Sequence, residues 1–319
     1  VLSEGVAKGS EAEAPKPSEL AASPASPTRP GSFQDLVAQR PVVSSLLLAA
    51  QAARGRGEVL GHVFLSGPPG VGKTTLARLL STVQGTGFQE TVAGHIGEAH
   101  RLVELLVGLH HGDILFLDEI HRLRGSLEET LYTALEDGFV DVLVSDRAQA
   151  RRIRIRLEAF TLVGATTRPG SLSAPFRGRF QHSERLLPYT VEQLSDLVAR
   201  TARKLRVSLD PKGALEIAYR SRGTPREAIR ILEHLRDWVQ VCKILTVKFD
   251  HVVQFCVRLG IDALGLNRED QQIIGLLLAE GKPIGQAALA ARLGLDLEPL
   301  RDVHEPWLER MGLLERTKR

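Results

Sequence analysis

Three short apolar runs, each ending in small or charged residues, occur in the part of the chain before Leu187. They read GHVFLSG at 61–67, GDILFLDE at 112–119 and FTLVGATT at 160–167. Helix-like stretches separate them, and this alternation is typical of a parallel sheet with helices on both faces. The pattern predicts an α/β domain over residues 29–187.

Beyond about Leu187 the strand-like runs stop and amphipathic helical patterns replace them. We expect helices at 190–205, 211–221 and 224–243, two of which open on the Thr or Pro residues that favour helix starts. These patterns predict a small helical domain over 188–262.

The last part of the chain, from about Leu264, has a different organisation. Three short helical patterns lie at 267–281, 285–294 and 297–312, and LLERTKR at 313–319 could supply the last strand of a wing. We therefore expect a winged-helix module over 263–319, which either contacts DNA or serves only as a packing module.

The first 28 residues are rich in Ala, Ser, Pro and Glu and poor in large apolar side chains, so we expect a disordered tail at 1–28. Over all 319 residues, the content of 43% hydrophobic and 25% charged residues is typical of soluble globular proteins. No apolar run approaches the roughly 18 residues of a membrane span, and the N-terminus does not resemble a secretory signal. We expect a cytoplasmic protein without membrane contact.

Charge and cysteine content narrow the function only slightly. The net charge of +3 and the pI near 9.0 are compatible with a nucleic-acid partner but do not require one. Cys242 and Cys256 lack metal-type spacing, so we expect both to be buried small apolar residues.

A glycine-rich loop, GPPGVGKTT from Gly67 to Thr75, follows the first apolar run and opens a helix. Glycines here let the backbone aim its N–H groups at phosphate oxygens, next to the positive end of the helix. Lys73 would reach the β and γ phosphates of a nucleotide, and the Thr74 hydroxyl would bind Mg²⁺. The alternative is a glycine-rich turn that only joins strand to helix.

The second run ends in the adjacent carboxylates Asp118 and Glu119. Asp118 suits a Mg²⁺ shell, and Glu119 can polarise an attacking water, although paired acidic residues at strand ends are often only solvated caps. Nearby His121 would either pack and cap or relay a signal.

Hydroxyl and guanidinium groups supply further candidates. Thr166 or Thr167 could hold the lytic water or sense the γ phosphate, and we favour Thr167 over Thr166. Arg226 falls in the first turn of a helix, where a cation is unfavourable, so an anionic partner such as a nucleotide phosphate would explain it; the alternative is a surface ion pair.

Five stretches together resemble the RuvB family, AAA+ motors of Holliday junction branch migration. They are GPPGVGKTTLA, DEIHRL, GATTRPGSLSAPFRGRF, ALEIAYRSRGTPR and HEPWLERMGLLERT, and the similarity extends from Arg29 to the end of the chain. The first stretch is common to many ATPases, whereas the others are fairly specific. The resemblance implies a P-loop AAA+ ATPase domain with a parallel sheet, a small helical AAA+ domain and a C-terminal winged helix.

The same resemblance implies a function and its partners. It implies an ATP- and Mg²⁺-dependent DNA translocase, a homo-hexameric ring on duplex DNA at four-way junctions, working with a RuvA-type protein in recombination and repair. Its catalytic residues would be Lys73, Asp118, Glu119, Thr167 and, supplied to the neighbouring subunit, the arginine finger Arg179, with Arg177 beside it. The alternative interpretation is that these two arginines are a solvated pair on the surface without a catalytic role.

The expected nucleotide contacts are Arg29, Pro30, Val37, Gly67, Gly70, Gly72, Lys73, Thr74, Thr75, Tyr189 and Arg226. Arg29, Pro30, Val37 and Tyr189 would form the adenine pocket. Here the chain reads LVAQ at 36–39, where the family usually has an aromatic residue followed by Ile-Gly-Gln.

The family's RuvA-docking hairpin corresponds to DVLVSDRAQARRIRIRL at 141–157, in which charged and apolar residues alternate as in a strand. Its glycine-rich tip is SDRA in this chain. For DNA we expect contacts to phosphates from Arg316, Lys318 and Arg319. Two alternatives to a translocating motor remain. One is an ATP-dependent switch or loader of the initiator or clamp-loader type, and the other is a paralogue that serves another complex.

Overall fold

The computed structural model describes residues 28–317 except 147–148. The expected tail at 1–28 lies outside the described residues apart from Thr28. Five parallel strands form one sheet in the order β2-β3-β6-β1-β7. Their bounds are β1 Val63–Ser66, β2 Phe88–Val92, β3 Ile114–Asp118, β6 Thr161–Thr166 and β7 His182–Arg185. The predicted parallel α/β domain is confirmed.

The three predicted strands are the three central ones, because only strands covered on both faces are uniformly apolar. Every residue of β1 and β6 is buried. The sequence reading missed the edge strands β2 and β7, which read FQETV and HSER. Neither is uniformly buried, and edge strands do not need the continuous apolar run that reveals a central strand.

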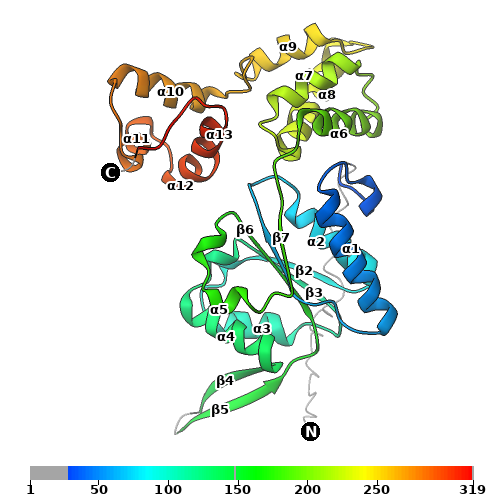
Figure 1. The fold of residues 1–319 in the computed structure, drawn as a ribbon, viewed down its shortest axis with the longest axis vertical. Helices are drawn as coiled ribbons and strands as arrows, with labels where there is room; N and C mark the ends of the chain where they lie inside the picture. Colours follow the sequence, from blue (N-terminus) through cyan, green and yellow to red (C-terminus); the bar gives the residue numbers. More distant parts are fainter. Residues whose placement is uncertain (1–27, 147–148, 318–319) are drawn as a thin grey trace, which may run out of the picture.

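Helices cover both faces of the sheet, as Figure 1 shows. One face packs against α1 (Arg40–Arg56) and α2 (Lys73–Gln84), and the other against α3 (Ala99–Val107) and α4 (Gly125–Asp137). Alternate residues of β1 enter the two cores, Phe64 on one side and Leu65 on the other. The short helices of this domain are η2 Phe33–Asp35, η3 Ala93–His95, η4 Ile120–Arg122, η5 Pro169–Ser171 and α5 Ala174–Arg177.

The predicted hairpin also exists. Strand β4 (Phe139–Asp146) pairs antiparallel with β5 (Gln149–Arg156), and the ribbon extends away from the main sheet (Figure 1). Asp141 forms ion pairs with Arg152 and Arg154 along one face of this hairpin.

The small helical domain contains α6 (Val191–Lys204), α7 (Pro211–Arg220), α8 (Pro225–Cys242) and α9 (Phe249–Arg258), so all three predicted helices are confirmed and a fourth is added. Thr190 caps α6 in a capping box with Gln193, the local reason for the helix start. Cys256 is buried as expected, but the expectation for Cys242 is wrong, because this last residue of α8 is exposed.

The C-terminal module consists of α10 (Arg268–Glu280), α11 (Gln286–Leu293), and the nearly continuous helical segment of α12 (Leu297–Pro299), η6 (Leu300–His304) and α13 (Glu305–Arg310). The expected wing strand is not formed within 313–317, the described part of LLERTKR. In the described part of this module no other strand is formed, so the segment has no neighbouring strand to pair with. In the described part of the chain, no helix has the length and apolar character needed to cross a membrane.

Candidate nucleotide and hydrolysis site

The glycine-rich loop leads from the carboxyl end of β1 directly into α2. Gly67 has φ of +149°, and a Cβ atom there would lie 2.5 Å from the carbonyl oxygen of Leu186. Gly72 caps α2 with φ of +103°, a conformation that side chains rarely adopt. Glycine is therefore required at these positions for the loop to turn tightly in front of a helix N-terminus, where anions bind favourably.

Lys73 is the first residue of α2 and is only 8% exposed. Its Nζ donates hydrogen bonds to the carbonyl oxygens of Gly67 (2.9 Å) and Pro68 (3.0 Å), which hold the ammonium inside the loop. Burial lowers the pKa of Lys73, while the nearby charges of Asp118 and Glu119 act in the opposite direction. The ammonium is thus held where it could meet a phosphate chain.

The two carboxylates follow at the end of the neighbouring strand β3. Asp118 Oδ1 accepts a hydrogen bond from the backbone N–H of Glu119 at 3.0 Å. Glu119 adopts the left-handed conformation, with φ of +49° and ψ of +46°. For a residue other than glycine this backbone costs about 1–3 kcal/mol, and such strain is concentrated at functional sites. The turn aims the Glu119 side chain along the sheet edge toward β6.

There the end of β6 meets Glu119. Thr167 donates a hydrogen bond through Oγ1 to Glu119 Oε2 at 3.3 Å, whereas Thr166 is fully buried and lies 2.8 Å from His121 Nδ1. His121 Nδ1 is also 3.1 Å from Glu119 Oε2. The sequence left His121 between packing and relay; in the structure it joins Glu119 to Thr166. Burial is the main cause that lowers the pKa of His121.

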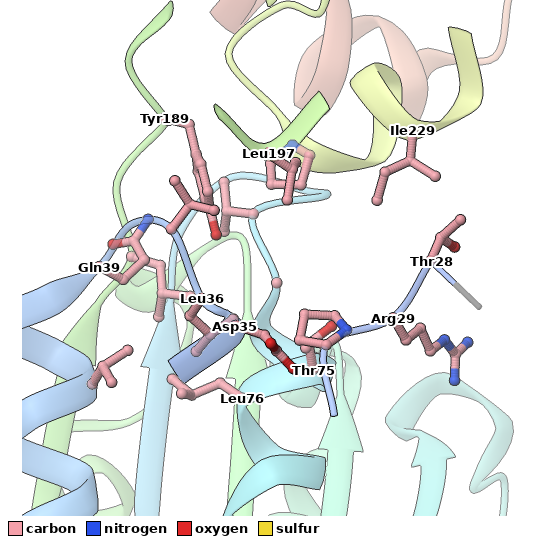
Figure 2. Close-up of a pocket in the computed structure, with 17 residues that line it drawn as sticks. Thr28, Arg29, Asp35, Leu36, Gln39, Thr75, Leu76, Tyr189, Leu197 and Ile229 are labelled. Carbon is pink, nitrogen blue, oxygen red and sulfur yellow. The ribbon is translucent and has the colours of Figure 1, made fainter. Parts of the chain in front are cut away.

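A pocket lies between α2, the N-terminal segment and the small helical domain, as Figure 2 shows. The expected adenine residues Arg29, Pro30, Val37 and Tyr189 all line it, together with Gly72 and Thr75 of the loop. Lining residues that the sequence did not indicate include Asp35, Gln39, Val71, Leu76, Leu197 and Ile229. Its walls are mostly apolar, as suits the faces of a purine ring.

Gln39 ties this pocket to the segment that connects the two domains. Its amide donates from Nε2 to the carbonyl of Leu187 at 2.6 Å and accepts from the Leu187 N–H at 3.2 Å. Two residues later, Tyr189 is 9% exposed, and burial raises its pKa to about 12. The contact was missed because Gln39 and Leu187 are far apart in sequence and nothing local indicates their pairing.

Arg226 enters the same region from the first turn of α8. A Cβ atom on Gly70 would lie 3.0 Å from the Cβ of Arg226, so the small helical domain contacts the glycine-rich loop here. The positive charge of Arg226 contributes to lowering the pKa of Lys73. Among the described residues no carboxylate forms an ion pair with Arg226, which leaves its guanidinium available for an anion.

The donors expected to hold Mg²⁺ are the Thr74 hydroxyl, in the first turn of α2, and the Asp118 carboxylate at the end of β3. Hydroxyl and carboxylate oxygens are hard ligands, and Mg²⁺ in nucleotide sites typically takes one or two of them plus phosphate oxygens. Within the described part of the chain, no group of three or more His, Cys, Asp or Glu side chains could hold a metal. The chemistry of this donor set fits Mg²⁺ held jointly with a nucleotide.

The expected finger, Arg179, lies outside this cluster. Its Nη2 bonds Glu136 at 2.7 Å and the Tyr132 hydroxyl, and its guanidinium lies 4.4 Å from the Tyr132 ring centroid. Two residues earlier Arg177 is exposed. These contacts, all to α4, hold Arg179 at the surface of its own subunit rather than at its own phosphate site.

The expected DNA residues are placed only in part. Arg316 forms ion pairs with Glu305 (3.0 Å) and Glu309 (2.8 Å), so its charge is already matched within the module. Lys318 and Arg319 lie outside the described residues. The two tryptophans fill cores: Trp307 belongs to the winged-helix core and Trp238 packs against Phe255 at 5.5 Å between ring centroids.

Three family models match consecutive parts of the chain. The Holliday junction DNA helicase RuvB P-loop domain matches residues 28–186, the RuvB AAA lid domain 189–262 and the RuvB C-terminal winged helix domain 263–319. We use the name lid for the small helical domain from here on.

Individual relatives agree with these matches. The Holliday junction branch migration complex subunit RuvB of Anaeromyxobacter sp. (strain Fw109-5) is 44% identical, over 91% of this chain and 86% of its own length. The RuvB protein of Myxococcus xanthus is 43% identical, over 91% and 85%. The solved Thermotoga maritima RuvB branch migration motor superposes with a TM-score of 0.83 at 40% identity, covering 92% of this chain and 94% of that one.

A more distant likeness concerns the fold alone. The Orc1 protein of Aeropyrum pernix, solved in complex with DNA, superposes with a TM-score of 0.54 at 19% identity, over 90% of this chain and 87% of its own. The RuvB relatives above cover 91–92% of this chain at 40–44% identity. The chain therefore belongs to the RuvB family, the ATP-dependent motors of Holliday junction branch migration.

Proposed function

We propose that this RuvB-family chain binds ATP in the pocket between α2 and the lid and hydrolyses it at the edge formed by β1, β3 and β6. The main support is that three separate segments bring Lys73, Glu119 and Thr167 together: Glu119 bonds Thr167, and its charge acts on Lys73 of the P-loop. Hydrolysis there would drive DNA through a ring of identical subunits.

The roles of the residues follow from their positions. Lys73 would exchange its loop carbonyls for the β and γ phosphates, and Arg226 would close on the γ phosphate from the lid. Mg²⁺, held by Thr74 and Asp118, would offset phosphate charge. Glu119, oriented by Thr167 and His121, would accept a proton from the attacking water. The strained backbone at Glu119 supports this role, because it directs the carboxylate out of the strand.

The partners belong to the same proposal. Relatives named as subunits of the Holliday junction branch migration complex support DNA at four-way junctions and a partner of the RuvA type. The homo-hexameric ring on duplex DNA is what we infer from the resemblance to the family. Arg179 would then complete the active site of the neighbouring subunit, a contribution that raises hydrolysis rates by about 10³–10⁵ in other nucleotide hydrolases. Its position just after α5, where it bonds side chains of α4, suits such a contact.

The test is to measure ATP hydrolysis and unwinding of a synthetic four-way junction, each with and without the RuvA protein of the same organism. We expect ATP-dependent unwinding that RuvA stimulates. Hydrolysis on DNA without a RuvA response would indicate a paralogue that serves another complex. ATP-dependent assembly on DNA without any unwinding would indicate a switch or loader.

A further inference from the structure

Two ion pairs connect the winged-helix domain to the hydrolysis edge of the same subunit. Arg168 bonds Asp302 through two nitrogens, with Nε 3.2 Å from Oδ1, and Arg122 pairs with Glu298. Asp302 and Glu298 both belong to the helical segment α12–η6, and Figure 1 shows this segment on the side of its domain that faces the sheet. Both arginines come from the loops that carry the candidate catalytic groups.

Arg168 directly follows Thr167, which bonds Glu119. Its backbone N–H donates to Thr166 Oγ1 at 2.9 Å, and the same oxygen lies 2.8 Å from His121 Nδ1. Arg168 is therefore connected, through the backbone and one hydrogen bond, to the hydroxyl groups and the histidine that contact the Glu119 carboxylate. The side chain of Arg168, by contrast, points away from this cluster to the winged helix.

Arg122 has the corresponding position on the other loop. It is the last residue of η4, the turn that follows Glu119 and contains His121, and its backbone N–H donates to the carbonyl of Glu119 at 2.8 Å. The ion pair between Glu298 and Arg122 therefore contacts the same turn that contains the strained Glu119 backbone.

The Arg168–Asp302 pair is the better shielded of the two. Its side chains are 28% and 17% exposed, against 41% and 48% for Arg122 and Glu298. The charges of Arg168 and Asp302 reach the cluster: Arg168 contributes to lowering the pKa of His121 and Asp302 to raising it, although burial has the larger effect. Bidentate geometry and partial shielding make this pair stronger than a typical surface ion pair.

The winged helix is at the same time attached to the lid. Arg222, in the turn between α7 and α8, bonds both carboxylate oxygens of Asp270 at 2.5 Å, and Asp270 is fully buried. A cavity of about 470 Å³ lies between these attachments, lined by Gly70, Arg226 and Asp302 among others. The winged-helix module thus contacts the lid on one side of the phosphate region and the hydrolysis edge on the other.

We propose that Asp302 and Glu298 are positioning residues for hydrolysis: through Arg168 and Arg122 they hold the loops of Thr167 and Glu119 in the productive arrangement, and so couple the winged helix to the ATPase site within one subunit. This proposal rests on the proposed function. It assigns to the winged helix a second task besides any contact with DNA, namely to set the hydrolysis rate according to its own position.

The test compares Asp302→Asn and Arg168→Gln with the reversed pair Arg168→Asp/Asp302→Arg in the full chain, in the presence of RuvA and a four-way junction. Each single variant should reduce kcat for ATP about tenfold, within the range of measured coupling effects, and leave KM and nucleotide binding nearly unchanged. The reversed pair should recover a large part of kcat, because it restores an ion pair between positions 168 and 302. If the two substitutions damaged the structure independently of each other, the double variant would show no recovery.

The matched control is Arg301→Gln. Arg301 Nε also reaches Asp302 Oδ1 at 3.3 Å but stays within the winged helix, so its loss should leave kcat unchanged. If a variant at 168 or 302 fails to fold, as judged by its thermal unfolding midpoint, Glu298→Gln tests the same idea on the more exposed pair. The expected result there is a smaller decrease of kcat, roughly threefold.

Two outcomes would overturn the proposal: wild-type kcat and wild-type stimulation by DNA in Asp302→Asn, or additive losses with no recovery in the reversed pair. A wild-type protein that itself shows no ATP hydrolysis would instead overturn the proposed function, so the two failures are distinguishable in one assay.

Discussion

Thr167 Oγ1 donates a hydrogen bond to Glu119 Oε2 over 3.3 Å, joining the ends of β6 and β3. The bond spans 48 residues of sequence, and it exists because parallel pairing brings the carboxyl ends of the two strands to one edge. It gives the carboxylate that we propose as catalytic a fixed direction before any substrate arrives. Preorganisation of this kind is how protein groups contribute to phosphoryl transfer.

Replacing Glu119 by Gln should stop hydrolysis while ATP remains bound. The amide keeps the size of the side chain but cannot accept the proton of water, so we expect kcat to fall by about 10²–10⁴ and rings to be stabilised with ATP. Single-turnover hydrolysis and equilibrium binding of ATP measure the two effects. Glu129→Gln, a change at an exposed residue of α4, is the control. Unchanged turnover in Glu119→Gln would mean that the water is activated elsewhere.

Lys73→Ala should lose nucleotide binding, because it removes the ammonium group that is hydrogen-bonded inside the glycine-rich loop. Titration calorimetry with ATP should show a loss of roughly 100-fold or more in affinity, the size expected when a charge-assisted phosphate contact of about 3 kcal/mol disappears. Lys73→Arg retains the charge and separates loss of charge from loss of fit. Normal ATP affinity in Lys73→Ala would rule out the P-loop assignment.

Arg179→Ala should bind ATP and fail to hydrolyse it, since the guanidinium is expected at the neighbour's phosphate. Mixing Arg179→Ala with Lys73→Ala subunits should restore part of the activity, because some interfaces then combine an intact P-loop with an intact finger. ATPase rates as a function of mixing ratio measure this.

Arg177→Ala is the matched control for Arg179→Ala, because Arg177 is an exposed arginine two residues away. Its activity should remain close to wild type. Mixed rings that form, as detected by mass, yet show no recovery would exclude action of Arg179 between subunits.

Stability should decrease in acid because of His62. Its Nδ1 accepts the N–H of Leu162 at 3.0 Å, which only a neutral ring can do, and burial lowers the pKa of His62 from 6.5 to about 4. Between these values the unfolded chain binds more protons than the folded one. The free energy of unfolding should therefore fall as the pH falls from 6.5 to about 4, by about 3 kcal/mol at most.

Urea unfolding at pH 7.0, 5.5 and 4.5 measures this dependence. His62→Asn, which keeps an acceptor but cannot be protonated, should flatten the curve, whereas His111→Asn at an exposed position should not. An equally steep curve in His62→Asn would show that other groups cause the acid sensitivity.

Gly67→Ala should destabilise the large domain by about 2 kcal/mol or more, because the added Cβ meets the Leu186 carbonyl at 2.5 Å in a backbone conformation that suits glycine. Denaturant unfolding measures the loss. Gly85→Ala separates the causes, since Gly85 also has a positive φ, +72°, but has open space around it. Equal losses in the two variants would mean that close approach to Leu186 does not matter.

Local signals identified most of the hydrolysis edge. An apolar run precedes the glycines of the loop, the carboxylates after β3 and the hydroxyls after β6. Such runs are typical of central parallel strands, and the carboxyl ends of these strands lie at one edge of the sheet. His121 and Arg168 could not be assigned in this way. Their neighbours, Thr166 and Asp302, are distant in sequence, and a histidine or arginine in a polar loop has no local pattern that reveals its partner.

The edge strands and the expected wing strand show a second limit of prediction from the sequence. The polar strands β2 and β7 form because a neighbouring central strand offers unpaired backbone groups, which the composition of FQETV or HSER does not reveal. The expected strand in LLERTKR fails within its described part for the converse reason, since no neighbouring strand is there to pair with it. Pairing of this kind depends on what lies alongside in space.

By itself the sequence determined the three-part organisation, the family, the phosphate loop and the carboxylate that faces it, because periodic burial and glycine geometry are local properties of the chain. Only the tertiary structure decided which groups orient that carboxylate, that Gln39 holds the connection at Leu187, and that Asp302 reaches Arg168 from the winged helix. The physical reason is that hydrogen bonds and ion pairs act over about 3 Å in space, whatever the separation along the chain.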